Sequence, residues 1–361
     1  MSDLNKIKNT VSTSSLASLE KTADFTNFNK ATNVIEVSTE IIDTLTANAL
    51  PLSNRAFKDI IYQNIISDGF TPQGVTNIGS SLLISAYKNG ELSRVYIYDS
   101  LTKKYKGKVI LDNKAHVGGI TYDKENKILF TTGSNGSVNA YNYEVINEIM
   151  SSKKDDSIDG FTININDYKK ANNNIYQKIK IDCDININYK DNMDSNASTI
   201  YYYNGRIYIG SFEGTKQGDL VSYRFNYDEN NNTIKKSDLK VSSLPAVTQG
   251  IAITEYNNNM YLVTAQSVGI TNSSITIYES SPNNKEMKPK RLYLNERGIE
   301  GIQIRDNGEV IAVFENGKTE VLSTNIEKLN EQAKYMNDLS LGDYINTGFQ
   351  GAGGIIYDIF H

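Results

Sequence analysis

The apolar and polar positions of this 361-residue chain repeat one pattern of short β-strands. A small or polar residue and a glycine open an apolar run, and a second apolar run follows after a polar turn. The openings lie at Gly74, Gly119, Gly250 and Gly301, with a degenerate copy at Thr199. Short apolar runs bounded by glycine and polar turns are typical of strands. The pattern therefore predicts an all-β chain of five similar units.

Each unit continues into further strands. The second strands are predicted at residues 82–84, 128–130, 207–209, 261–263 and 310–313. Third strands with an apolar-x-x-Tyr ending are predicted at residues 95–98, 138–141, 220–223 and 275–278, with Leu322 at the matching place in the fifth unit. A repeat of roughly 45–50 residues built from short strands is typical of propeller blades. The sequence thus predicts a five-bladed β-propeller over residues 57–324.

Outer fourth strands follow the third strand in four of the five units. They are predicted at residues 105–111, 175–181, 234–241 and 287–294. The fifth unit has none, because the chain turns polar and helix-like after Ser323. An unpaired edge strand invites association with other chains. We therefore expect the strand-like run Phe57–Ile66 to pair with the last strand of the fifth unit, near Thr319–Leu322, and to close the ring.

Three segments lie outside this repeat. Apolar residues at helical spacing between residues 33 and 50 predict a helix inside a polar N-terminal segment, residues 1–56. An insertion at about residues 144–195 contains a predicted short helix, Glu144–Met150. The C-terminal tail, residues 325–361, is expected to be helical and then glycine-rich. Each end segment either packs on the propeller or binds a partner, and both are candidates for oligomerisation.

Composition narrows the function classes. The formal net charge of −5 argues against nucleic-acid binding, which depends on clustered Lys and Arg. One cysteine, Cys183, excludes an intramolecular disulfide or a multi-Cys zinc site, and two histidines exclude a His-rich one. No stretch is long enough for a transmembrane segment, and the N-terminus lacks the apolar core of a signal peptide. We expect a cytoplasmic protein, with secretion or membership of an exported assembly as the alternative.

Polar residues recur where the blades would meet. The first strand of each blade lines the central channel of a propeller, so equivalent residues converge on the axis. The residue before the opening glycine is polar in most units, and two further polar residues lie two positions earlier in their own units. The candidate ligand-binding residues are Gln73, His116, Asn196, Ser198, Gln249 and Glu300. Their amide, hydroxyl, carboxyl and imidazole groups suit a neutral polar ligand such as a sugar.

Aromatic side chains are candidates for stacking on such a sugar. They are Tyr87, Tyr201, Tyr202 and Phe212. As a catalytic set the axial residues are sparse, because glycoside hydrolysis needs two carboxyl groups and only Glu300 is expected at this layer. No catalytic residue is assigned, and it stays open whether the chain is an enzyme. The candidate cofactor is a divalent cation such as Ca²⁺, held by Glu300, Asn196 and backbone carbonyls, although no contiguous calcium-loop motif occurs.

Four segments carry a resemblance to known proteins. They are Pro72-Gln73-Gly74-Val75, Leu83-Ile84-Ser85-Ala86-Tyr87, Val95-Tyr96-Ile97-Tyr98-Asp99 and His116-Val117-Gly118-Gly119-Ile120. The chain resembles, over roughly residues 70–320, a group of β-propeller proteins from low-GC Gram-positive bacteria with Gln-Gly and His-Val-Gly-Gly blade starts. The resemblance implies the propeller fold and frequent export, and it identifies no catalytic residues. The missing signal peptide and the predicted helical ends depart from that group.

Three hypotheses of function follow. The first is a non-enzymatic binding protein that recognises a carbohydrate or protein partner at the channel mouth. The second is a metal-assisted hydrolase of a glycoside, lactone or phosphoester, with Glu300 as ligand or base and His116 assisting. The third is a structural component of a phage or toxin assembly, in which the end segments carry the function.

Overall fold

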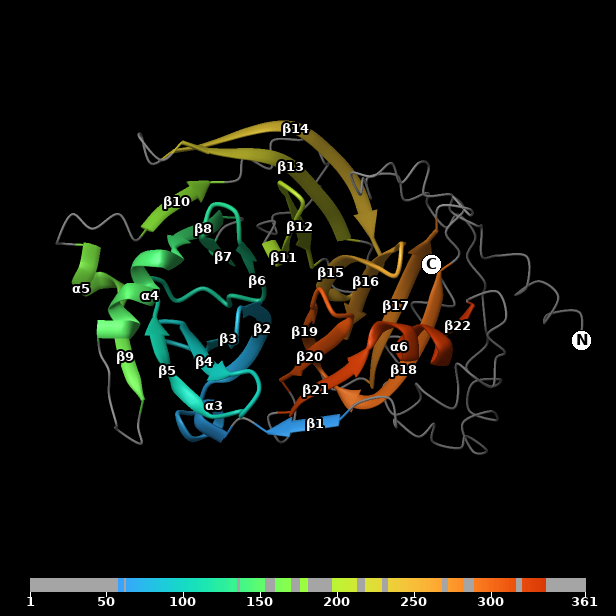
Figure 1. Ribbon diagram of the computed structural model, residues 1–361, viewed down its shortest axis with the longest axis horizontal. Coiled ribbons are helices and arrows are strands. Elements are labelled where there is room, and N and C mark those ends of the chain that lie inside the picture. The colour runs from blue at the N-terminus through green and yellow to red at the C-terminus, as the bar shows by residue number, and fades with distance from the viewer. Residues whose placement is uncertain are drawn as a thin grey trace, which may run out of the picture.

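The computed structural model describes most of the repeat region. The described residues are 58–61, 63–134, 137–152, 160–169, 176–180, 197–212, 218–228, 233–267, 272–281, 289–315 and 320–335. They form five sheets arranged around a common centre, as Figure 1 shows. The fold is a five-bladed β-propeller, as the sequence predicts.

The first strand of each blade lies nearest the centre (Figure 1). Blade one contains β2 (Thr71–Ile78), β3 (Ser81–Tyr87), β4 (Arg94–Asp99) and β5 (Tyr105–Ile110). Blade two contains β6 (Ile120–Asp123), β7 (Ile128–Thr132), β8 (Ser137–Asn142) and β10 (Tyr176–Lys180). Blade three contains β11 (Ala197–Tyr203), β12 (Arg206–Ser211), β13 (Gly218–Asp228) and β14 (Thr233–Leu244). Blade four contains β15 (Thr248–Tyr256), β16 (Asn259–Gln266), β17 (Asn272–Ser280) and β18 (Lys290–Arg297).

Blade five takes its outer strand from the other end of the repeat region. It contains β19 (Ile299–Ile304), β20 (Glu309–Phe314), β21 (Glu320–Asn325) and β1 (Lys58–Ile61). The strands β1 and β21 are antiparallel, with Ile60 opposite Val321. The predicted closure of the ring by the strand before the first blade is thereby confirmed.

The predicted closing strand, Phe57–Ile66, is too long. The strand ends at Ile61, and the short helix α3 (Gln63–Ser67) follows it. Gly69 has a φ of 73°, and the N–H of Phe70 donates to the carbonyl oxygen of Ile65 at 3.0 Å. A glycine with positive φ just after a helix closes its last turn in this way. The chain therefore turns before it enters blade one.

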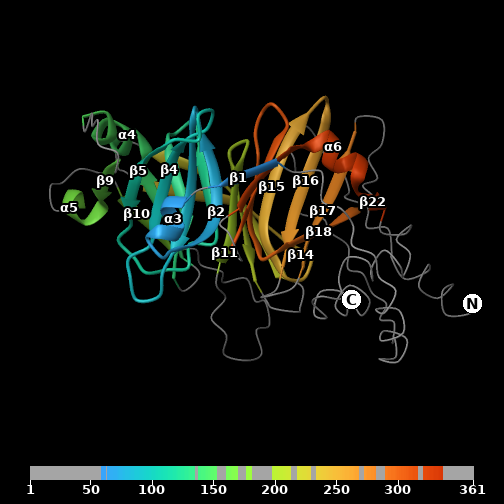
Figure 2. The same cartoon turned by 90° about the horizontal axis from the view of Figure 1, so that it is seen from below.

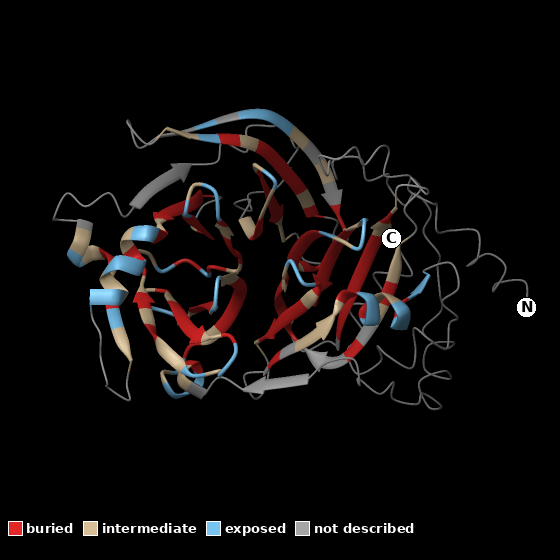
Figure 3. Ribbon diagram, viewed as in Figure 1, coloured by how far each residue is buried: buried red, intermediate tan, exposed pale blue. Residues whose placement is uncertain are grey.

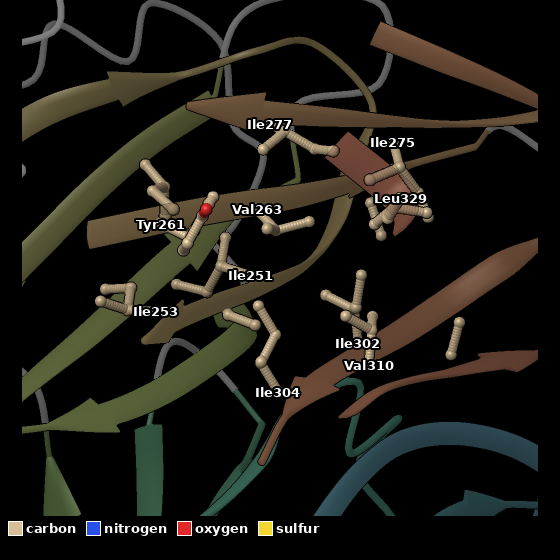
Figure 4. Close-up of a cluster of buried hydrophobic side chains, with 14 of the residues drawn as sticks. Ile251, Ile253, Tyr261, Val263, Ile275, Ile277, Ile302, Ile304, Val310 and Leu329 are labelled. Carbon is tan, nitrogen blue, oxygen red and sulfur yellow. The ribbon is translucent and has the colours of Figure 1, made fainter. Parts of the chain in front are cut away.

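The hydrophobic core lies between neighbouring blades. One cluster joins blades one and two, through residues such as Leu83 and Leu129. Others join blade two to three and blade five to one. The largest, drawn in Figure 4, spans blades three to five and includes Val263 and Ile302. Figure 3 shows these buried residues concentrated in the strands of the blades. Full burial of one such side chain contributes about 1.5–3 kcal/mol to the free energy of unfolding. Because these side chains are buried between blades, each blade is stabilised mainly by its neighbours.

The insertion after β8 links blades one and two. It forms α4 (Tyr143–Ser152), β9 (Phe161–Asn164) and α5 (Ile165–Lys169) before it returns to blade two as β10. The strand β9 adds to blade one parallel to β5, and Ile163 is fully buried in the core between the two blades. The helix α4 lies where the sequence predicts one. The addition of β9 to blade one is not predicted by the sequence pattern.

The chain after blade five folds back along blade four. The helix α6 (Ile326–Gln332) begins at Asn325, whose side chain accepts a hydrogen bond from the N–H of Glu327 at 2.8 Å. The two-residue strand β22 (Lys334–Tyr335) then pairs with β18 (Figure 2). The predicted helix between residues 33 and 50 and the tail from residue 336 lie outside the described residues. Among the helices of the described part, none is long and apolar enough to cross a membrane.

Neighbouring blades approach backbone to backbone at the opening glycines. A Cβ atom built on Gly74 would lie 2.9 Å from the carbonyl oxygen of Gly118. One built on Gly301 would lie 2.7 Å from the carbonyl oxygen of Gln73. Real Cβ atoms do not come this close to backbone atoms. Glycine is therefore required at the junctions of blade one with blades two and five.

Closure by β1 should be measurable by truncation. A chain that lacks residues 1–62 loses β1, whereas a chain that lacks residues 1–56 keeps it. We expect the shorter chain to melt at least about 5 °C lower and to self-associate, because the edge of β21 becomes free. Circular dichroism melts and light scattering during size-exclusion chromatography measure both effects. If both truncated chains were monomeric and melted at the same temperature, β1 would not be needed to close the ring.

The glycine requirement predicts a contrast between two substitutions. Gly301→Ala places a methyl group against backbone, whereas Gly210→Ala places one against the side-chain ends of Leu244 and Thr199. We expect Gly301→Ala to lower the free energy of unfolding by about 1–3 kcal/mol and Gly210→Ala to lower it by less, because side chains can shift. Urea unfolding followed by tyrosine fluorescence provides the measurement. A smaller loss at Gly301 than at Gly210 would contradict this account of the blade junctions.

Candidate functional site at the axial mouth

The ladder between first and second strands is irregular at the same place in four blades. The breaks lie between Pro72 and Val75, Ala197 and Thr199, Thr248 and Gly250, and Ile299 and Gly301. Each break contains the polar residue that precedes the opening position. These residues are Gln73, Ser198, Gln249 and Glu300. A β-bulge redirects a side chain and is common beside functional sites. Four of the six predicted ligand-binding residues thus share one backbone feature.

Gln73 is fully buried at the bulge of blade one. Its Nε2 donates to the carbonyl oxygen of Pro72 at 2.9 Å, and its side chain is hydrogen-bonded to Glu315. Its Oε1 has no donor among the described residues. An unpaired buried oxygen of this kind costs about 1–3 kcal/mol, so this atom is a candidate contact for a ligand.

Glu300 occupies the bulge of blade five and is only 5% exposed. Burial, and then the charge of Glu315, raise the pKa of Glu300 to about 9. Its carboxyl group is therefore protonated at neutral pH and can donate a hydrogen bond. A carboxylic acid kept neutral in this way is common in catalytic and binding sites.

Glu315 follows β20 in the same blade. Its N–H donates to the carbonyl oxygen of Gly298 at 2.8 Å, which places it beside the start of β19. Burial raises the pKa of the Glu315 carboxyl group, and the hydrogen bond with Gln73 opposes this shift. The expectation that Glu300 is the only carboxyl group at this layer is therefore wrong.

Tyr87 and His116 form an aromatic pair next to these acids. Tyr87 ends β3 opposite Thr71, and its ring centroid lies 3.9 Å from that of His116, with the planes tilted by 42°. Burial, followed by the charges of Glu315 and Glu300, raises the pKa of the Tyr87 hydroxyl. His116 keeps contact with solvent, yet the protein atoms around its ring lower its pKa by disfavouring the imidazolium form.

We call Gln73, Tyr87, His116, Glu300 and Glu315 the axial cluster. The members come from blade five, from blade one and from the loop that enters blade two. Together they offer a neutral carboxylic acid, a second carboxyl group, a buried amide and a partly open aromatic pair. Such a set can hydrogen-bond hydroxyl groups and contact an apolar face of the same ligand.

The other predicted residues lie elsewhere on the mouth or outside the described residues. The Oγ of Ser198 donates to the carbonyl oxygen of Gly210 at 3.2 Å, within its own blade. Gln249 is half-buried at the bulge of blade four. Neither shares a described contact with the axial cluster. Asn196 falls outside the described residues.

The placement of one aromatic and one acidic residue differs from what the sequence predicts. Tyr201, a candidate for stacking on a sugar, is only 4% exposed and lies in the largest core cluster, so it is not available to a ligand. Glu315, which sequence reasoning missed, directly follows the second strand of its blade, and Tyr87 is the last residue of the second strand of blade one. A comparison of the residues that end each second strand would have placed both side chains at the same mouth.

Comparisons with known proteins support no statement about the family or function of this chain. No family model matches the chain, and no curated protein matches it. The WD40 β-propeller domain of Doa1 is similar at 10% identity, with a TM-score of 0.33 over 72% of this chain and 95% of that chain. An exo-β-1,3-galactanase from Phanerochaete chrysosporium, solved with galactose, is similar at 9% identity, with a TM-score of 0.40 over 73% of this chain and 61% of that chain. At these TM-scores neither similarity supports a statement about ligand or activity.

The raised pKa of Glu300 predicts a pH-dependent stability. The unfolded chain releases this proton near pH 4.5 and the folded chain near pH 9, so the folded state loses stability as pH rises through that window. We expect Glu300→Gln to raise the free energy of unfolding by on the order of 1–3 kcal/mol at pH 8 and to change it little at pH 4.5.

Urea unfolding in EDTA across pH 4.5–9 measures this effect. The control is Glu125→Gln, which changes an exposed carboxylate on the turn between β6 and β7. If the stabilities of the wild-type chain and of the Glu300→Gln variant fell by the same amount as the pH rises, this result would contradict a protonated Glu300.

Proposed function

We propose that the protein is a non-enzymatic binding protein that recognises a carbohydrate at the axial mouth of the propeller. The observation that carries this proposal is the Tyr87–His116 ring pair beside the neutral acid Glu300 and the buried amide of Gln73. Sugars present apolar C–H faces to aromatic rings and hydroxyl groups to polar side chains. The axial cluster supplies a partner for each kind of surface.

Electrostatics favour a neutral ligand over a charged one. The protonated Glu300 carries no charge at neutral pH, so it donates to a hydroxyl group without repelling it. An anionic ligand would lie near the carboxyl group of Glu315, which makes its binding unfavourable. Gln73 Oε1 adds a buried acceptor that rewards a ligand hydroxyl placed opposite it.

A protein partner is the alternative occupant of the same mouth. The axial cluster favours the carbohydrate, because its polar atoms lie deep in the blade starts while only part of the aromatic pair is open to solvent. The hypothesis of a phage or toxin assembly depends on the end segments, residues 1–56 and 336–361, which lie outside the described residues. It stays a hypothesis.

Hydrolysis is the second candidate function, and the pair of acids favours it. Glycoside hydrolysis uses one protonated carboxylic acid and one carboxylate. Environments that separate the protonation states of two acids are typical of acid–base catalysis. Glu300 would act as the acid and Glu315 as the base or nucleophile. Release of reducing sugar from a bound glycan, abolished by both Glu300→Gln and Glu315→Gln, would favour this function over binding alone.

Binding should depend on the aromatic and amide members of the axial cluster. We expect a glycan array to identify a neutral oligosaccharide, whose affinity is then measured by calorimetry. Tyr87→Ala should weaken binding about 3- to 10-fold through lost stacking, and Gln73→Ala about 10-fold through a lost buried hydrogen bond.

The matched control is Tyr335→Ala, because Tyr335 is an exposed tyrosine on the outer edge of blade four. Its substitution should leave the affinity unchanged. Glycan binding that survives both Tyr87→Ala and Gln73→Ala would place the site elsewhere. A pull-down that yields only a protein, competed by no glycan, would support the protein partner.

A further inference from the structure

The outer edges of four blades are short or partly covered. The outer strands of blades two and five, β10 and β1, have five and four residues. In blade one β9 lies outside β5, and in blade four β22 lies outside part of β18. Blade three differs, because its outer strand β14 has 12 residues and no other described strand pairs with its outer side. A long free edge of this kind is a template for pairing with another chain.

The strand β14 is interrupted by a β-bulge. Between two regular pairs of its ladder, Tyr223 of β13 is opposite two residues of β14, Asp238 and Leu239. Asp238 has a φ of 53°, in the left-handed region that is uncommon for residues other than glycine. A bulge bends its strand and breaks the row of regular backbone groups. It does so beside Leu239, which is 49% exposed and would add apolar surface to a straight edge.

A buried arginine holds this bulge. Arg206 of β12 is 4% exposed, and its guanidinium reaches across β13 to β14. Its Nη1 donates to the carbonyl oxygen of Asp238 and to the Oγ of Ser222, each at 3.0 Å. Its Nη2 donates to the carboxylate of Asp238, and the Nε of Arg224 lies 3.7 Å from the same carboxylate. Asp238 is thus fixed through both its backbone and its side chain.

The contacts of Arg206 oppose a straight edge. In a regular antiparallel strand the backbone carbonyl lies in the sheet and accepts from an N–H of a neighbouring strand. The carbonyl oxygen of Asp238 accepts instead from a side chain. A regular register would turn this residue back into the ladder and leave the guanidinium without two of its acceptors. Because a buried cation with missing partners is unfavourable, Arg206 stabilises the bulged register.

We propose that the contact between Arg206 and Asp238 is a guard that keeps the outer edge of blade three from pairing with a second copy of this chain. Lys235, exposed on the same strand, assists it, because edge-to-edge pairing of two copies would bring like charges together. Bulges and lysines are two of the means by which edge strands avoid association. The guard lies on the outside of the propeller (Figure 1), so it does not depend on carbohydrate binding at the axis.

Two substitutions at one position separate the backbone from the charge. Asp238→Gly and Asp238→Thr both remove the carboxylate, but glycine adopts a positive φ readily and a β-branched residue does not. We expect Asp238→Thr to self-associate at about 1–100 μM, so that its mean mass rises toward that of a dimer, and Asp238→Gly to associate less. Light scattering during size-exclusion chromatography measures the mass, and circular dichroism shows whether each variant is folded.

Release of the guard from its other side is the second test. Arg206→Met removes the guanidinium and leaves the carboxylate of Asp238, which is 48% exposed, to water. We expect this variant to associate as well. The matched control is Arg305→Met, because Arg305 is also largely enclosed and pairs with Glu309 at 2.6 Å in blade five. The control should stay monomeric.

Hydrogen exchange locates the contact between copies. In the associated variants the amides of residues 233–244 should exchange at least about 10-fold more slowly than in the wild-type chain, because the new pairing protects them. Folded Asp238→Thr and Arg206→Met chains that are both monomeric would overturn the proposal. Association that leaves exchange in residues 233–244 unchanged would overturn it too. If Asp238→Thr does not fold, Arg206→Met decides by the same two readouts.

Discussion

The close approach of backbones at the propeller axis is the constraint on which the rest of the structure depends. At the junctions around blade one, the strands come so near that only glycine fits, as at Gly74 and Gly301. The ladder accommodates this approach by an irregular step at the opening position of four blades, which is a glycine in three of them and Thr199 in blade three. The residue in that step leaves the regular alternation of the strand. Packing at the axis and placement of polar side chains are therefore one structural feature.

Burial at the axis also sets the chemistry of the site. Glu300 is almost completely enclosed, and its neutral form follows from desolvation before any ligand is considered. Tyr87 and His116 lie further out, where the rings keep contact with solvent. The mouth is thus graded from a dry interior of hydrogen-bonding groups to a partly wet aromatic rim, as in many small-molecule sites.

The fold could be predicted from the sequence because its signals are local. An opening glycine, an apolar run and a polar turn each lie within a few residues, and their repetition gives the number of blades and the closing strand. The parallel addition of β9 to blade one was not predictable, since it pairs Ile110 with Asn164 across a segment that has no repeat signal. The same holds for α3, which depends on the backbone conformation at Gly69.

For the candidate site, the sequence analysis proposed Gln73, His116 and Glu300, whereas it did not point to Glu315. Glu315 lies beside Glu300 only through the register of β19 and β20, where Ile299 is opposite Phe314. A repeat pattern shows which residues are equivalent between blades. It does not show which side chains face each other within one blade, because that depends on the position of the bulge.

The pairing of β1 with β21 has a consequence for how the molecule is made. The two strands are roughly 260 residues apart in sequence, so β1 leaves the ribosome long before its partner is made. Until then the nascent propeller is an open arc whose exposed blade faces can bind other chains. Closure of the ring is therefore a late folding step that converts this aggregation-prone arc into the native domain. It cannot occur before β21 has been synthesised.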